Sequence, residues 1–151
     1  MLTRRLTLAS VHLCLTCLLA LTAKPPAKIC TRDIIAKVQH LKDAPDLMSL
    51  ECRLYTPTIE DYMRCPGATI KCFADEIGVL IQEWERVPRG GFKLNVKLGK
   101  LARQFLNKAP EDSPCFRCEL SKEQRAGEFL QDLLSTLQAV NAQRCSTPET
   151  S

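Results

Sequence analysis

Residues 65–84 read CPGATIKCFADEIGVLIQEW, a stretch that joins two cysteines to a long apolar stripe. Its apolar side chains recur every three or four residues, as on one face of a helix: Ile70, Phe73, Ile77, Leu80, Ile81 and Trp84. This spacing predicts a helix over about 69–84. Trp84 is the only tryptophan in the chain, and tryptophan is enriched at binding hot spots. Because Trp84 continues the stripe, we expect it to pack against the core instead.

The same periodicity predicts helices over about 31–43, 93–107 and 121–144. Thr31 is suited to cap the first of these helices. Ser121 and Gln124 have the spacing of a capping box at the start of the last one. Four amphipathic helices of this length can bury one shared core, so the chain is expected to form a single all-α domain.

The connections between these helices are unequal. A short helical turn is expected through Met48 and Leu50, and the proline-containing stretch 53–67 is interpreted as a long connection. The break between the second and third helices is short. No strand is predicted, because alternation with a period of two occurs only in very short runs. Long crossover connections are typical of up-up-down-down four-helix bundles.

The beginning of the chain has the pattern of a signal peptide over 1–23. A short basic start precedes an uncharged, mostly apolar run, and Lys24-Pro25-Pro26 follows at once. A membrane anchor is the alternative, since the run approaches the roughly 20 residues that span a bilayer. The proline-rich break favours cleavage. We therefore expect a secreted, extracellular domain over 24–151 with no membrane span after cleavage and a disordered tail from about 146.

Nine cysteines are many for 151 residues, and an oxidising compartment explains them as structural staples. Cleavage removes Cys14 and Cys17 and leaves seven. An odd number means that at least one cysteine is unpaired or bonds another chain.

Charge and histidine content exclude several functions. The chain has 21 basic and 17 acidic residues, an imbalance too weak to indicate a nucleic-acid partner. His40 is the only histidine after cleavage and is followed by Leu41 and Lys42, so the histidine–aspartate pair of a secreted phospholipase is missing. Cys115-x-x-Cys118 lacks the further ligands of a zinc site and the preceding strand of a redox motif. We expect no catalytic residues, no metal and no cofactor.

Two short strings resemble the interleukin-15 and interleukin-2 family, interleukin-15 most of all. The first runs through Leu54-Tyr55-Thr56, Cys65 and Lys71-Cys72-Phe73. The second runs through Cys115-Phe-Arg-Cys118-Glu119 and Glu128-Phe129-Leu130-Gln131. The resemblance covers roughly 34–143, and the extra cysteines indicate an interleukin-15-like relative. It implies an up-up-down-down cytokine bundle stapled by disulfides.

The resemblance also implies two disulfides, Cys65–Cys115 and Cys72–Cys118. A third follows from the bundle topology, in which the first helix starts at the end where the last one finishes. Cys30 precedes the first helix and Cys145 follows the last, so we predict that they pair. Cys52 is left over, either free or intermolecular.

By the same resemblance, three receptor surfaces are implied. The residues matched to the contacts of a private alpha receptor ectodomain are Tyr55, Glu76, Glu83 and Glu119. Gln138 matches a contact of the shared gamma chain. The shared beta chain would meet Lys37, where the family has an acidic residue, and Asn95. For the glutamates and for Gln138, an ordinary solvated helix surface is the alternative.

These observations favour a secreted cytokine that acts on lymphocytes and is not an enzyme. The alternative is a saposin-like or antimicrobial helical module that binds lipid, although its terminal cysteine pairs are not matched. A row of cations on the third helix, Lys93, Lys97, Lys100 and Arg103, has the charge of a heparin or membrane patch. We interpret the row as a solvated face.

Overall fold

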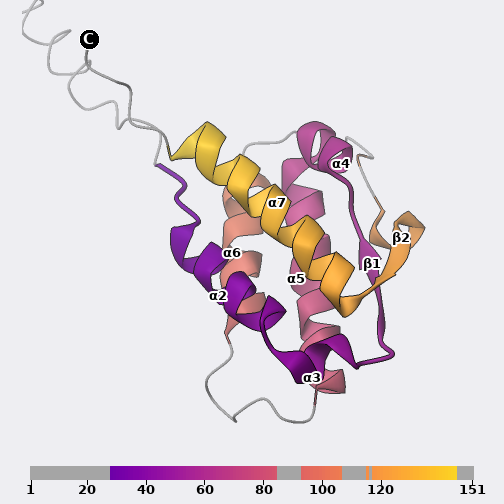
Figure 1. The fold of residues 1–151 in the computed structure, drawn as a ribbon. Coiled ribbons are helices and arrows are strands. Elements are labelled where there is room, and N and C mark those ends of the chain that lie inside the picture. Colours follow the sequence, from indigo (N-terminus) through magenta and orange to yellow (C-terminus); the bar gives the residue numbers. More distant parts are fainter. Residues whose placement is uncertain (1–27, 85–92, 107–114, 116, 146–151) are drawn as a thin grey trace, which may run out of the picture.

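The computed structural model describes residues 28–84, 93–106, 115 and 117–145 (Figure 1). The expected signal peptide, its cleavage site and the expected tail lie outside these residues. No helix in the described part of the chain is long and apolar enough to cross a membrane.

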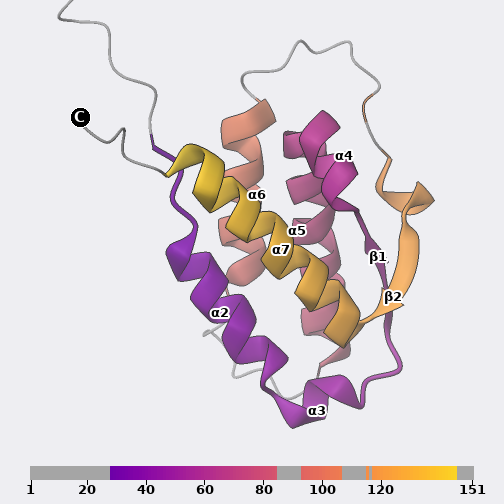
Figure 2. The same cartoon turned by 45° about the horizontal axis from the view of Figure 1, so that its top comes forward.

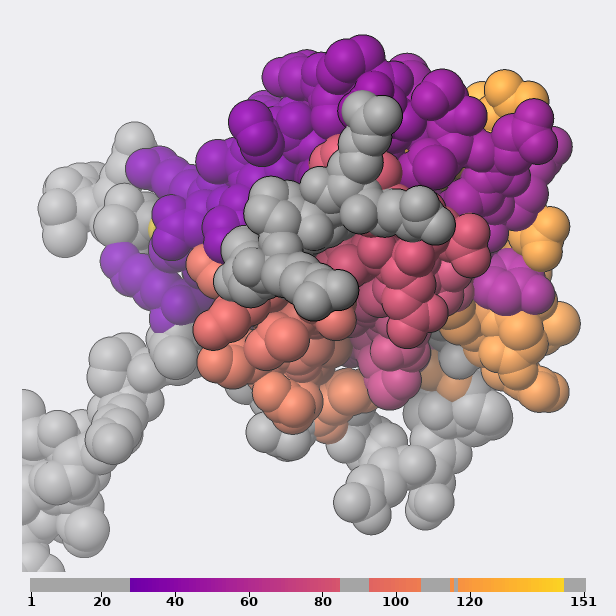
Figure 3. All heavy atoms as spheres, turned by 90° about the horizontal axis from the view of Figure 1, so that it is seen from below, coloured from indigo at the N-terminus to yellow at the C-terminus, as the bar shows by residue number. Residues whose placement is uncertain are grey.

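Four long helices form the body of the molecule. They are α2 (Arg32–Lys42), α5 (Pro66–Glu83), α6 (Leu94–Leu106) and α7 (Ala126–Arg144). Helices α2 and α5 run in one direction and α6 and α7 in the other, which is the expected up-up-down-down order (Figures 1 and 2). Helix α5 packs along α6, and α2 packs along α7. Figure 3 shows α5 and α6 side by side, with α2 and α3 across the adjoining edge.

The core lies between the four helices. Phe73 of α5 and Phe129 of α7 are fully buried and their ring centroids are 5.5 Å apart. Burying one such side chain contributes roughly 1.5–3 kcal/mol, so the apolar stripes account for most of the driving force. Trp84 packs half-buried against this core, in agreement with its place on the stripe.

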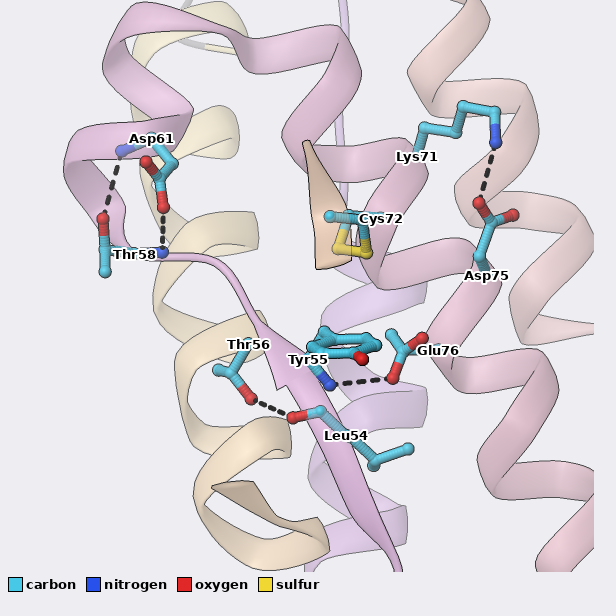
Figure 4. The surroundings of a disulfide bond; sticks show 10 residues. Leu54, Tyr55, Thr56, Thr58, Asp61, Lys71, Cys72, Asp75 and Glu76 are labelled. Atoms are coloured by element: carbon cyan, nitrogen blue, oxygen red, sulfur yellow. Dashed lines mark hydrogen bonds and ion pairs between the residues drawn. A yellow bond between two sulfur atoms is a disulfide. The ribbon is translucent and has the colours of Figure 1, made fainter. Parts of the chain in front are cut away.

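The connection from α2 to α5 contains more structure than expected. It holds α3 (Pro45–Met48), the strand β1 (Arg53–Thr56) and α4 (Ile59–Arg64). The first of these corresponds to the expected helical turn. Helix α4 was not predicted, although Thr58 and Asp61 form a full capping box at its start: the Asp61 N–H donates to Thr58 Oγ1, and the Thr58 N–H donates to the Asp61 carboxylate (Figure 4).

A two-stranded ribbon corrects the expectation that the chain has no strand. Strand β1 pairs antiparallel with β2 (Lys122–Arg125), and Tyr55 lies opposite Glu123. The capping box expected at Ser121 is therefore wrong, because the residues after Ser121 are extended and α7 begins only at Ala126. Ser121 instead ends the 3-10 helix η1 (Cys118–Leu120). Pairing with β1 outweighs the local helix signal.

Three disulfides join the described cysteines in the three expected pairings. The Cα atoms are 4.8 Å apart in Cys30–Cys145, 5.7 Å in Cys65–Cys115 and 5.3 Å in Cys72–Cys118. Near the first of them, Thr31 does not cap α2 with its side chain: its hydroxyl donates to the Leu137 carbonyl of α7 at 2.8 Å. Its backbone N–H donates to Asn141 Oδ1 at 3.1 Å. The start of α2 is thus bonded to the end of α7.

Candidate functional site

Strand β1 is held against α5 by a buried carboxylate. Figure 4 shows Glu76 pointing from α5 toward the backbone of Tyr55, whose N–H donates to Glu76 Oε2 at 2.8 Å. Glu76 is only 8% exposed. Burial raises the pKa of Glu76, and the Tyr55 N–H partly opposes this rise. The side chain therefore positions β1, and its oxygens are largely withdrawn from solvent.

The Cys72–Cys118 disulfide brings a second acidic residue to the same side of α5. It ties η1 to the helix, so that Glu119 lies near β1 on the surface. Hydrogen bonds from its own backbone N–H and from the Arg117 guanidinium lower the pKa of Glu119. The Arg117 Nη2 donates to Glu119 Oε1 at 2.8 Å. Glu119 is thus ionised and exposed, with one cation beside it.

Glu83, the last residue of α5, is exposed two helical turns beyond Glu76. Cys52, unpaired among the described cysteines, is half-buried near both glutamates. Burial, followed by the negative charges of Glu83 and Glu76, raises the pKa of the Cys52 thiol. A thiol that resists ionisation is a poor nucleophile, so Cys52 is disfavoured as a partner for disulfide exchange.

The ribbon adds an acidic residue that the sequence reasoning missed. Glu123 of β2 is exposed, lies opposite Tyr55, and is close enough to Glu76 for its charge to raise the Glu76 pKa. Residues 122–125 were expected to be helical, which would have placed Glu123 elsewhere. We call the surface formed by Tyr55, Glu83, Glu119 and Glu123 the strand face.

The other predicted contact residues lie on different surfaces. Gln138 is exposed on α7, on the side away from the core. Lys37 and Asn95 are not brought together, because they line two separate grooves on the flanks of α6. Lys37 lines the groove between α2 and α6, whereas Asn95 lines the groove between α5 and α6, beside Gly78.

A family model described as interleukin 15 matches residues 11–141 of the chain. The chain belongs to the interleukin 15 family. The match covers the ribbon, three of the four long helices, α7 up to residue 141, and five of the six cysteines in the described disulfides. It confirms the resemblance carried by the cysteine-centred strings. Comparison with curated proteins and with solved structures finds no match.

Membership of the interleukin 15 family makes the chain a cytokine, whose partners are cytokine receptors. The family is one of signalling proteins, not of enzymes. Among the described residues, no group of three or more histidine, cysteine or acidic side chains is placed to hold a metal ion.

Proposed function

We propose that this chain is a secreted interleukin-15-type cytokine that binds an alpha receptor ectodomain through the strand face and signals on lymphocytes through shared beta and gamma chains. One observation carries the alpha-receptor assignment. Three exposed carboxylates and Tyr55 lie on one side of the bundle, on elements fixed to one another by a disulfide, a ribbon and the Glu76 hydrogen bond.

A surface fixed in this way suits tight binding to a basic partner. Ordering loops on association costs binding free energy, and a ribbon that is already ordered avoids much of that cost. Exposed carboxylates accelerate encounter with a basic surface and select against acidic partners. Glu119 and Glu123 extend from short elements beside Tyr55, where a receptor can contact them together.

Glu76 takes a supporting part in this proposal. Its contact with the Tyr55 N–H fixes the backbone of β1, and its small exposed fraction leaves little surface for a receptor. We therefore assign the direct contacts to Glu83, Glu119 and Glu123, with Tyr55 at their centre.

Gln138 is the proposed contact of the gamma chain, because it projects from α7 without a role in the core. The beta-chain contacts are proposed on α2 and α6. Lys37 reverses the family's acidic charge there, so a beta chain that fits this surface needs an acidic group opposite Lys37.

The test is binding of the oxidised mature protein to the alpha receptor ectodomain, by surface plasmon resonance at several salt concentrations. Glu83→Lys, Glu119→Lys and Glu123→Lys should each weaken binding, mainly by slowing association, and the triple variant should abolish it. Asp43→Lys, which reverses an exposed acid at the end of α2, is the matched control and should bind like wild type. Wild-type affinity in the triple variant would refute the strand-face assignment.

The lipid-binding alternative is tested in parallel with liposomes at physiological salt. The apolar faces of all four helices are buried in one core, so lipid binding would require the bundle to open. We expect no binding to liposomes and saturable binding to the receptor ectodomain. The reverse result would favour the saposin-like module.

A further inference from the structure

Helices α2 and α6 enclose a groove on the side of the bundle away from the ribbon. The groove has a volume of about 480 Å3. Its lining residues are Asp33, Ala36, Lys37, His40, Lys93, Leu94 and Lys97. Three of these seven are lysines, and Asp33 is the one carboxylate among them. We call this site the lysine groove.

Within the described residues, the lysines of the groove lack carboxylate partners. In the part of the chain that the structure describes, no salt bridge includes Lys37, Lys93 or Lys97. Helix α6, residues LNVKLGKLARQFL, contains no acidic residue at all. An exposed helix of a stable domain usually intersperses both signs of charge. The excess positive charge is therefore concentrated on this flank.

Two of the ammonium groups are neighbours. The pKa of Lys37 is lowered by its side-chain contact with Lys97, then by partial burial and by repulsion from the same charge. Asp33 acts in the opposite direction and does not cancel the effect. Placing like charges together costs free energy in the unbound protein, and an anion lying between them removes that cost.

The cations also form a line. Lys93, Lys97 and Lys100 follow one another at four- and three-residue intervals on the same side of α6. At 1.5 Å per residue, the row is about 10 Å long. Lys37 lies beside the middle of this row. A chain-like polyanion with charges repeated along its length matches such a row.

We infer that the lysine groove binds a linear sulfated polysaccharide. Lysine is a compact point charge on a flexible stem, which suits separate sulfate groups, whereas planar carboxylates of an acidic protein are matched best by arginine. A membrane is a poorer fit, because the two exposed apolar side chains of α6, Val96 and Leu106, line the groove between α5 and α6 and not the lysine groove. Among the described residues that line the groove, His40 carries the one aromatic ring, so the groove offers little stacking surface for nucleic-acid bases.

The inference does not depend on the receptor assignment, since its test contains no receptor. The probe is heparin, used as an affinity column with a salt gradient and as an immobilised ligand at physiological salt. The groove variant combines Lys37→Gln, Lys93→Gln and Lys97→Gln. The matched control combines Lys28→Gln, Arg53→Gln and Lys71→Gln, which removes the same charge from exposed residues elsewhere.

Wild type and control should be retained on heparin above physiological salt. The groove variant should elute at much lower salt, with affinity reduced about tenfold or more. Its far-ultraviolet circular dichroism and urea midpoint should be unchanged or improved, because like charges have been removed. Chemically desulfated heparin should bind none of the three proteins.

Four results would overturn the inference. If the groove variant and the control lose the same affinity for heparin, net charge alone determines heparin binding. Equal binding to desulfated heparin would remove the role of sulfate. Binding to polyglutamate as strong as binding to heparin would indicate an acidic protein partner. Binding to phosphatidylserine vesicles at physiological salt, without heparin binding, would indicate a membrane.

Discussion

The strand face lies along the ribbon of β1 and β2, and the lysine groove lies between α2 and α6, helices that Figure 2 shows on the opposite side of the bundle from the ribbon. The two surfaces are constructed differently. On the strand face, a disulfide, a ribbon and the buried Glu76 fix β1 and η1 against α5, and Glu119 has a cation of its own beside it. Along the lysine groove, α2 and α6 meet through side-chain packing, and neighbouring ammonium groups repel each other. The polar groups of the strand face help to hold the fold together, whereas the ammonium groups of the lysine groove have no carboxylate partner among the described residues.

The difference indicates which residues can change without loss of the fold. Substitutions that cut the attachments of the strand face should cost stability and binding together. Substitutions in the lysine groove should leave the bundle intact, because its charges are unfavourable to the unbound protein.

The largest effect should come from removing the Cys72–Cys118 disulfide with Cys72→Ala plus Cys118→Ala. The loss should be about 2–4 kcal/mol in the free energy of unfolding, because the unfolded chain gains conformational freedom. Glu119 is also released from α5, so alpha-receptor affinity should fall. Urea unfolding and plasmon resonance measure the two effects.

The matched control is Cys30→Ala plus Cys145→Ala, which removes a disulfide far from the strand face. It should cost a similar free energy of unfolding but leave the affinity of the folded protein unchanged. If both pairs weaken receptor binding equally, the Cys72–Cys118 bond has no special part in shaping the strand face.

The next effect concerns the buried carboxylate. Glu76→Ala leaves the Tyr55 N–H without its acceptor and should destabilise the protein by about 1–3 kcal/mol. Glu76→Gln keeps an acceptor oxygen and should preserve most of the stability. Urea midpoints at neutral pH compare the two variants. Equal losses in both would show that the negative charge, not the hydrogen bond, holds β1.

Glu76 should also make stability depend on pH. Because its pKa is raised on folding, the folded state holds the proton more tightly, and stability falls as pH rises from about 4 through the folded-state pKa. Glu76→Gln should show a smaller fall over this window. If the stability of wild type and of Glu76→Gln fell equally with pH over this window, Glu76 would not be the source of the pH dependence.

A smaller effect of opposite sign is expected in the lysine groove. Lys37→Gln removes the repulsion with Lys97 and should raise the urea midpoint slightly. The gain should shrink with added salt, which screens the charges. Lys28→Gln, at an exposed position before α2, should change nothing. A destabilised Lys37→Gln protein would mean that Lys37 has a structural role.

The smallest effect is expected for an exposed ion pair. Lys71 Nζ lies 2.7 Å from Asp75 on the outer surface of α5, with both side chains well exposed. Surface pairs of this kind contribute little, so Lys71→Ala should change the free energy of unfolding by about 0.5 kcal/mol or less. A loss as large as that of Glu76→Ala would erase the distinction between buried and exposed carboxylates on this helix.

The four long helices could be predicted from the sequence because the apolar repeat in each extends over several helical turns. The stripe that includes Phe73 and Leu80 repeats over several turns, so the helix and its buried face follow from spacing. The Cys30–Cys145 pairing followed from topology, since opposite helix directions bring these positions together. The other two pairings followed from family resemblance.

The ribbon could not be predicted because it depends on the pairing of two segments that lie far apart in the sequence. Strand β2 has the residues KEQR, without alternating apolar side chains, and its partner β1 lies far away in the sequence. Only the folded chain brings them together, and only then is Glu76 covered. The seven-residue spacing of Glu76 and Glu83 correctly indicates that both lie on one face of α5. It does not indicate that β1 covers the part of this face that holds Glu76.

The Cys30–Cys145 bond has a mechanical consequence. It joins Cys30, two residues before α2, to Cys145, the residue just after α7, and so ties the start of α2 to the end of α7 at one corner of the molecule (Figure 1). Tension applied between the two chain ends is therefore carried by a covalent bond and bypasses the four helices. A protein fused to either terminus would leave from that same corner, and the bundle between would bear no load.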